Sequence, residues 1–300
     1  MSDASFRALN FQDHRRELDS NRHIYAVVSR RSRGLSIGVN LNADKVCNFD
    51  CPYCQVDRTV PGGPRVVDRQ QLRGELDQLL DLVQSGTLWG ISPFNTAAME
   101  FRRVNDIAFA GDGEPTTCRD FPGVVASVVE SRDAHGLSAV RIHLLTNATM
   151  FHRPAVWSGL ELLAAAGGEI WAKLDAGTEA WFQRVDGTTL PFSLVLRNIE
   201  RAALHWPIVL QSMFHTWEGV GPSPQEIEAF AGRIGAILAV GGSIRQVQVY
   251  SVARRPADTR VGVLPLDGLE EIARVVRETI AQYETTTEVV VYEGVSWDDS

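Results

Sequence analysis

The chain has 300 residues, and 44% of them are hydrophobic, which suffices for one large domain or two small ones with a continuous core. Its formal net charge of -8 argues against a protein that coats nucleic acid through a general basic surface, although local positive patches remain compatible with it. No signal peptide and no run of about 18 apolar residues is visible, so we expect a cytoplasmic protein that does not associate with membranes.

Residues 1–34 lack the hydrophobic periodicity of the rest and are expected to form an N-terminal arm, whereas residues 35–300 form the core, with an insertion at about 86–105. In the core, short β-branched runs alternate with amphipathic stretches, the pattern of βα units with a parallel sheet. Right-handed crossovers predict an α/β fold, a partial (β/α)6 TIM-like barrel. The expected strands are 36–41, 107–110, 141–146, 169–174, 208–214 and 245–250, with a further run, 288–292, that closes or extends the sheet.

Three helices have clear start signals. Asp68 precedes a leucine-rich stripe and is expected to be its N-cap. Ser223 and Glu226, with a proline at the first helical position, read as a capping box. Asp267 and Glu270 predict the same arrangement for the last helix. These helices are expected to be packing elements and carry no chemistry.

Three of the four cysteines, Cys47, Cys51 and Cys54, lie on one loop after the first strand with the spacing C-x3-C-x2-C. They are too few and too clustered for the disulfide framework of a secreted protein. Three thiolates can each bind one iron of a cubane cluster, which leaves the fourth iron without a protein ligand. The alternatives are a structural zinc site, which usually has four ligands in two pairs, and an electron-carrying cluster, which would need a fourth cysteine.

With Tyr53 directly before the last cysteine, this loop resembles the hallmark of the radical S-adenosylmethionine (SAM) superfamily. The resemblance implies a [4Fe-4S] cluster held by Cys47, Cys51 and Cys54, SAM as the second cofactor, with Tyr53 in its site, and a barrel of the radical SAM type. The other cysteine, Cys118, follows Gly111 by seven residues and either reaches the site or is a buried inert thiol.

The second strand ends in the sequence Gly-Asp-Gly-Glu-Pro. Its glycines let the backbone approach a ligand closely, and its carboxylates can accept hydrogen bonds from an ammonium group. The segment resembles the superfamily motif that binds the amino group of SAM, and a tight turn is the alternative. Its residues, all candidates for cofactor binding, are Gly111, Asp112, Gly113, Glu114 and Pro115.

Polar residues also end the third and fourth strands. Lys173 and Asp175 share a strand face with Trp171, and a charge there requires a partner or a ligand. By resemblance, Asn147, Lys173 and Asp175 contact the ribose and carboxylate of SAM; a simple ion pair between Lys173 and Asp175 is the alternative. A polar stripe on later strands indicates either a lumen open to ligand or a solvated face: Gln211, His215, Gln246, Gln248 and Tyr250.

Segments 25–41 and 247–256 resemble a poorly characterised group of radical SAM proteins distantly similar to the wyosine-base synthases that modify tRNA. Those synthases carry extra cysteines for a second cluster, and this chain has only Cys118 left. Five arginines in or near these segments either clasp a phosphate or carboxylate or are surface charge: Arg30, Arg31, Arg33, Arg254 and Arg255.

These features predict a radical SAM enzyme of open reaction subclass that cleaves SAM to a 5'-deoxyadenosyl radical, which abstracts hydrogen from an unidentified substrate. The acidic net charge favours a small molecule or a peptide as substrate, whereas the resemblance and the arginines favour tRNA. A non-catalytic iron-sulfur scaffold is a third alternative. Because no second cluster can be built from four cysteines, an external one-electron donor, a flavodoxin or ferredoxin, is implied.

Overall fold

The computed structural model describes residues 21–29 and 34–295, so Arg30, Arg31 and Arg33 lie outside the described residues. The chain divides into two compact units. The first comprises Met1–Cys47, Arg58–Leu145 and Arg153–Glu169, and the second comprises Asn48–Asp57, Thr146–His152 and Ile170–Ser300. The division into an arm and a core at residue 34 stays a prediction.

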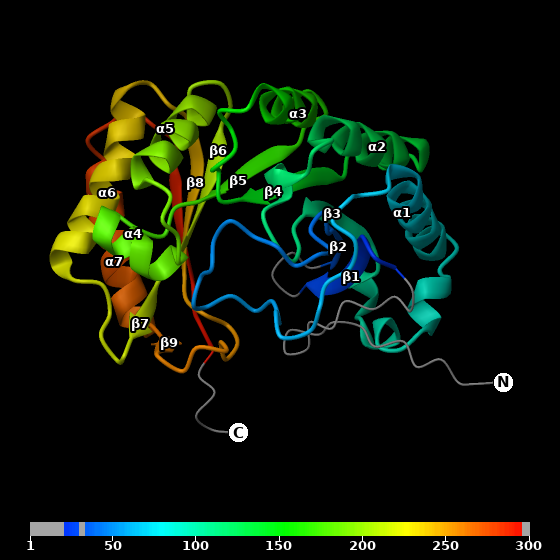
Figure 1. The fold of residues 1–300 in the computed structure, drawn as a ribbon, viewed down its shortest axis with the longest axis horizontal. Coiled ribbons are helices and arrows are strands. Elements are labelled where there is room, and N and C mark those ends of the chain that lie inside the picture. The colour runs from blue at the N-terminus through cyan, green and yellow to red at the C-terminus, as the bar shows by residue number, and fades with distance from the viewer. Residues whose placement is uncertain (1–20, 30–33, 296–300) are drawn as a thin grey trace. The chain divides into compact units, whose positions relative to one another are not determined.

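The first unit contains four adjacent strands. Strands β2, β3 and β4 run parallel, and β1 pairs antiparallel with β2 at the edge, in the register Ile24 to Val39. The helices of this unit lie along one side of the strands (Figure 1). The elements are β1 (Ile24–Ser29), β2 (Gly34–Val39), α1 (Arg69–Gln84), β3 (Val104–Phe109), α2 (Phe121–Ala134), β4 (Arg141–Thr146) and α3 (Pro154–Ala165).

Helix α1 begins as expected, because the side chain of Asp68 accepts hydrogen bonds from the backbone N–H groups of Gln70 and Gln71. Its leucine stripe is buried, with Leu72, Leu76, Leu79 and Leu80 at most 1% exposed. The expected insertion forms three short 3-10 turns, Thr87–Gly90, Phe94–Thr96 and Met99–Phe101. Strand β1 was missed because its sequence lies outside the βα repeat.

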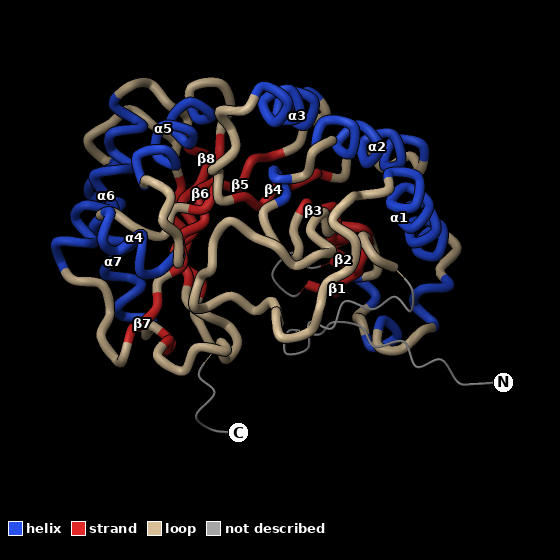
Figure 2. The backbone as a smooth tube through the Cα atoms, viewed as in Figure 1, coloured by secondary structure: helices blue, strands red, loops and turns tan. Residues whose placement is uncertain are grey.

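In the second unit, β5, β6, β8 and β10 run parallel in that order, so the run at 288–292 extends the sheet. Its helices form a layer against the strands (Figure 2). Strands β7 and β9 form a small antiparallel pair, which was not predicted. The elements are β5 (Glu169–Lys173), α4 (Glu179–Asp186), α5 (Phe192–Ala203), β6 (Ile208–Met213), β7 (His215–Trp217), α6 (Pro224–Ala239), β8 (Ile244–Tyr250), β9 (Val261–Val263), α7 (Leu266–Ile280) and β10 (Glu288–Tyr292).

Two of the expected caps in this unit differ from the prediction. Ser223 caps α6 by accepting from the backbone N–H of Glu226, but the Glu226 carboxylate accepts from the backbone N–H and hydroxyl of Thr178 instead of completing a capping box. The capping prediction for Asp267 is wrong, because α7 begins at Leu266 after Pro265 and Asp267 lies in its first turn. Within the described residues, no helix is both long and apolar enough to span a membrane.

Candidate active site

The loop after β3 packs closely against the loop that leads to Cys47, within the first unit. A Cβ atom on Gly111 would come within 2.2 Å of the Asn40 side chain, and one on Gly113 within 2.3 Å of the Val46 carbonyl oxygen. The glycines therefore permit a close approach to the protein's own backbone and side chains, where the sequence predicted a close approach to a ligand. Both residues remain candidates for SAM binding.

The acidic groups of this loop have protein partners. Asn40 donates to the Asp112 carboxylate at 2.6 Å and accepts from the Asp112 backbone N–H at 3.1 Å. The buried Glu114 carboxylate accepts from the backbone N–H and the hydroxyl of Thr116, and so caps the short turn that starts at Pro115. These bonds match the tight-turn alternative, and they also fix the direction of both carboxylates.

In the second unit, Asn147 is bound to the cysteine loop. Its amide nitrogen donates to Asn48 Oδ1 at 2.7 Å, and its amide oxygen accepts from the backbone N–H and the hydroxyl of Thr149. Asn48 in turn donates to the Thr149 hydroxyl at 2.6 Å, and its carbonyl oxygen accepts from Thr188. Asn147 therefore positions the residue that follows Cys47 in the chain.

Lys173 lies among residues of the same loop. Its ammonium pairs with Asp175 at 2.5 Å and with Asp186, and it lies 4.9 Å from the Tyr53 ring centroid and 5.7 Å from that of Phe49. The ion pair of Lys173 with Asp175 is the alternative that the sequence left open. Asp186, at the end of α4, was missed because no spacing in the sequence links it to the strand ends.

Asp175 is fully engaged as an acceptor. Its two carboxylate oxygens accept from the Tyr53 hydroxyl, the Lys173 ammonium and the backbone N–H of Met213 at 2.9 Å. Its side chain is completely buried, and the Asp186 side chain is almost so. The half-buried lysine between them satisfies the requirement that buried carboxylates be paired.

The electrostatics of this network follow from burial and pairing. Burial opposes the charge on Lys173, but Asp175 and Asp186 outweigh burial and hold its pKa well above the usual value. Burial raises the pKa of Asp186 to about 7, since the attraction of Lys173 offsets only part of the desolvation. Burial likewise raises the pKa of the Cys51 thiol, whose Sγ lies 3.9 Å from Asp186 Oδ1.

All four cysteines are free thiols, and the three of the loop are divided between the units, Cys47 in the first and Cys51 and Cys54 in the second. Within the described part of the chain, no three His, Cys, Asp or Glu side chains are grouped so as to hold a metal ion. The fit to an iron-sulfur cluster therefore rests on the donor set: three unpaired thiols on one loop, of which half-buried Cys51 has a raised pKa, so that a bound cation would favour its thiolate. The assignment of the three ligands stays a prediction.

Three glutamines of the polar stripe on the later strands form a chain of hydrogen bonds. Gln211 donates to Gln248 at 3.2 Å, and Gln248 donates to Gln246 at 2.8 Å. His215 is 1% exposed, and its Nε2 atom has no hydrogen-bond partner among the described residues, while its ring lies edge-on to Tyr53 at 5.6 Å. Cys118 is half-buried, and burial raises the pKa of its thiol.

Comparison with known proteins assigns the family. The family model described as the radical SAM superfamily matches residues 44–216, more than half of the chain, and this range contains the cysteine loop and the network around Lys173. The chain belongs to the radical SAM superfamily. Radical SAM proteins use a [4Fe-4S] cluster and SAM, so these are its cofactors. Membership supports SAM-cleaving radical chemistry by an enzyme.

The chain is also similar to curated proteins and to solved structures. A UPF0026 protein of Helicobacter pylori is 23% identical over 189 residues, 63% of this chain and 53% of that protein. The chain spans between 22% and 53% of the length of the curated relatives it matches. A structure of Streptococcus suis SuiB bound to S-adenosylmethionine covers 87% of this chain and 49% of its own, at 12% identity and a TM-score of 0.54.

A structure of TYW1 with a lysine-pyruvate adduct bound covers 88% of this radical SAM chain and 86% of its own, at 12% identity and a TM-score of 0.55. At such low identities the likeness concerns the fold. The mostly parallel α/β sheet and these neighbours confirm the predicted fold class, a partial (β/α)6 TIM-like barrel of the radical SAM type.

Proposed function

We propose that this radical SAM protein cleaves SAM reductively to methionine and a 5'-deoxyadenosyl radical, which abstracts a hydrogen atom from a small molecule or peptide. The observation that carries the proposal is the cysteine loop, whose spacing is that of the superfamily and whose Phe49 and Tyr53 rings lie beside half-buried Lys173 within the second unit. When bound, the reduced cluster supplies the electron that breaks the carbon–sulfur bond of SAM.

Different residues of the chain would bind the cluster and SAM. Cys47, Cys51 and Cys54 would hold three irons, and the loop 111–115 would receive the amino group of SAM. Lys173 has three ammonium hydrogens, and its two carboxylate partners leave the third for the carboxylate of SAM. Asn147, Asp175 and Tyr53 would complete the SAM site while they hold the cysteine loop in place.

An external electron donor, a flavodoxin or ferredoxin, would reduce the cluster, because Cys118 alone cannot bind a second one. The substrate radical would then determine whether the enzyme is an oxidoreductase, a transferase or a lyase. We further propose that the protein is cytoplasmic, since its four cysteines, three of them on one loop, are too few and too clustered for the disulfide framework of a secreted protein.

The test is anaerobic reconstitution with iron and sulfide, addition of dithionite and SAM, and chromatography for 5'-deoxyadenosine. Wild-type protein is expected to form 5'-deoxyadenosine, Cys51→Ala to form none, and the matched control Cys118→Ala to behave as wild type. A wild-type protein with a fully loaded cluster and no 5'-deoxyadenosine would favour the scaffold alternative.

The second candidate function is tRNA modification, which the resemblance to wyosine-base synthases and the arginines at 254 and 255 favour. Phosphate contacts release counterions, so genuine tRNA binding must weaken steeply with salt. Binding that is absent or insensitive to salt would leave the small-molecule or peptide substrate as the better proposal.

A further inference from the structure

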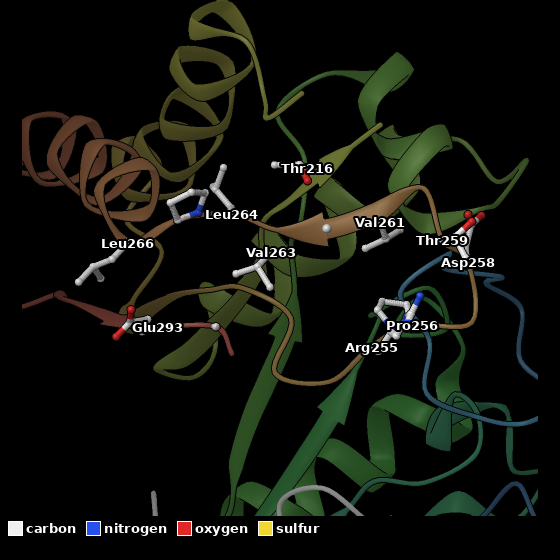
Figure 3. Close-up of a pocket in the computed structure, with 13 residues that line it drawn as sticks. Thr216, Arg255, Pro256, Asp258, Thr259, Val261, Val263, Leu264, Leu266 and Glu293 are labelled. Carbon is white, nitrogen blue, oxygen red and sulfur yellow. The ribbon is translucent and has the colours of Figure 1, made fainter. Parts of the chain in front are cut away.

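A cavity of about 600 Å³ lies in the second unit beside β9 (Figure 3). It is lined by Thr216 of β7, by the loop that follows β8, by β9 with the first residue of α7, and by Glu293 and Gly294 after β10. These segments come after the carboxyl ends of parallel strands, which is the edge where open α/β sheets bind ligands. The volume is within the range of ligand pockets in proteins.

One wall of the cavity is shared with the cysteine loop. Val261 lines the cavity and belongs to a buried cluster with Tyr53 and Val252, and Val263 and Cys51 pack against this cluster. A layer of valine side chains thus separates the cavity from the cysteine loop. Hydrogen abstraction needs the substrate carbon within about 3.5 Å of C5' of the adenosyl radical, so we place the reacting carbon on the cysteine-loop side of the valine layer. The cavity suits a remote part of a longer substrate.

The charges that line the cavity are of two kinds. Asp258 is neutralised by Arg260, which binds it through two nitrogens at 2.6 and 3.0 Å. Arg255 and Glu293 have no hydrogen-bond or ion-pair partner among the described residues. In Figure 3 Glu293 and Arg255 lie on different sides of Val263, and Asp258 and Thr259 lie beyond Arg255. The cavity therefore offers one cation and one anion with an apolar side chain between them.

We propose that this cavity anchors a peptide substrate, with a carboxylate at Arg255, apolar side chains against Val263 and Leu264, and a cationic group at Glu293. The inference rests on the proposed function and adds the substrate class to it. A peptide fits better than a compact zwitterion, because the same molecule must fill the cavity and reach past the valine layer. An RNA backbone fits poorly, because Glu293 would repel its phosphates. Binding of a remote part of the substrate would orient the reacting part.

The test is calorimetric binding of peptides to the full-length protein, with no reductant, so that it does not depend on SAM cleavage. The probes are acetylated and amidated peptides with glutamate first, one to three valines, and lysine last, together with the reversed sequences. One length is expected to bind saturably, and Arg255→Gln and Glu293→Gln are each expected to weaken it by about fivefold or more. Arg274→Gln is the control, because Arg274 pairs with Glu271 and Glu278 on α7 and does not line the cavity.

The double variant Arg255→Glu with Glu293→Arg is expected to reverse the preference between the two peptide orders, which a merely unfolded variant cannot do. Three results would overturn the inference: no peptide binds, the single variants bind as wild type does, or tRNA binds and its affinity falls with Arg255→Gln. If 5'-deoxyadenosine forms but no peptide binds, the inference fails and the radical SAM function stands. If peptides bind and no 5'-deoxyadenosine forms, the proposed function fails instead.

Discussion

The loop after β3 and the segment after β5 both follow parallel strands, yet different forces hold them. The loop of Gly111 and Gly113 is held by close backbone packing and by hydrogen bonds between Asp112 and the side-chain amide of Asn40. The segment of Lys173 and Asp175 is held by buried charges, which depend on one another. The first arrangement tolerates loss of a charge but not added volume, whereas the second tolerates no unbalanced charge.

Among the substitutions that test this comparison, Lys173→Met is expected to lower the free energy of unfolding most. The variant leaves the carboxylates of Asp175 and Asp186 buried without their cation, which costs about 3–5 kcal/mol of unfolding free energy. Urea unfolding would measure this loss. The same substitution at half-buried Lys45, whose ammonium donates an exposed hydrogen bond to the Val60 carbonyl oxygen at 3.2 Å, is expected to cost less than about 1 kcal/mol. Equal losses for the two lysines would contradict the role of buried charge.

Gly113→Ala tests the packed loop by adding one methyl group. The new Cβ would meet the Val46 carbonyl oxygen at 2.3 Å, and the backbone shift needed is expected to cost about 1–3 kcal/mol. Gly74→Ala is the matched control, since nothing lies within 4 Å of its Cβ position on α1 and alanine favours a helix by about 1 kcal/mol. Thermal unfolding should therefore show opposite signs, and two stabilising substitutions would refute the close packing.

Tyr53→Phe removes one hydrogen bond from the charged segment without changing its net charge. Loss of the hydroxyl that donates to Asp175 is expected to cost about 1–2 kcal/mol, because Lys173 and Met213 still satisfy the carboxylate. Tyr283→Phe serves as control, since its hydroxyl makes no hydrogen bond within the described residues. A chemical denaturation curve for Tyr53→Phe that overlays the wild-type curve would show that the bond contributes nothing.

The smallest effect concerns pH and His215, next to Tyr53. Burial lowers the pKa of His215 below 6.5, so the folded state binds fewer protons than the unfolded state below that pH. The contribution of His215 to stability is therefore fully present above pH 6.5 and falls as the pH decreases below it, by at most about 1.4 kcal/mol per pH unit, whereas the raised pKa of Asp186 acts in the opposite direction. His215→Leu should flatten this dependence in urea unfolding between pH 5 and 7.5, whereas His152→Leu, at an exposed position, should leave it unchanged.

Local pattern was enough for much of the fold. Strands β4 and β10 begin and end at the predicted residues, because short runs rich in apolar residues and bounded by polar ones fix them locally. Strands β1, β7 and β9 were missed, since the last two have only three residues each and pair with segments distant in sequence. The cap of α7 was misassigned because Asp267 has a residue type typical of an N-cap but lies two residues after the actual N-cap, Pro265.

The sequence by itself determined the family chemistry of this protein, because three thiols at fixed spacing and a glycine-rich acidic segment are local features. Only the tertiary structure decided which partners those residues have. Asp186, Asn48 and Asn40 come from separate parts of the chain, and their roles follow from burial, which forces each charge and amide to find a partner in space. The cavity beside β9 is likewise a product of chain packing, which no spacing in the sequence encodes.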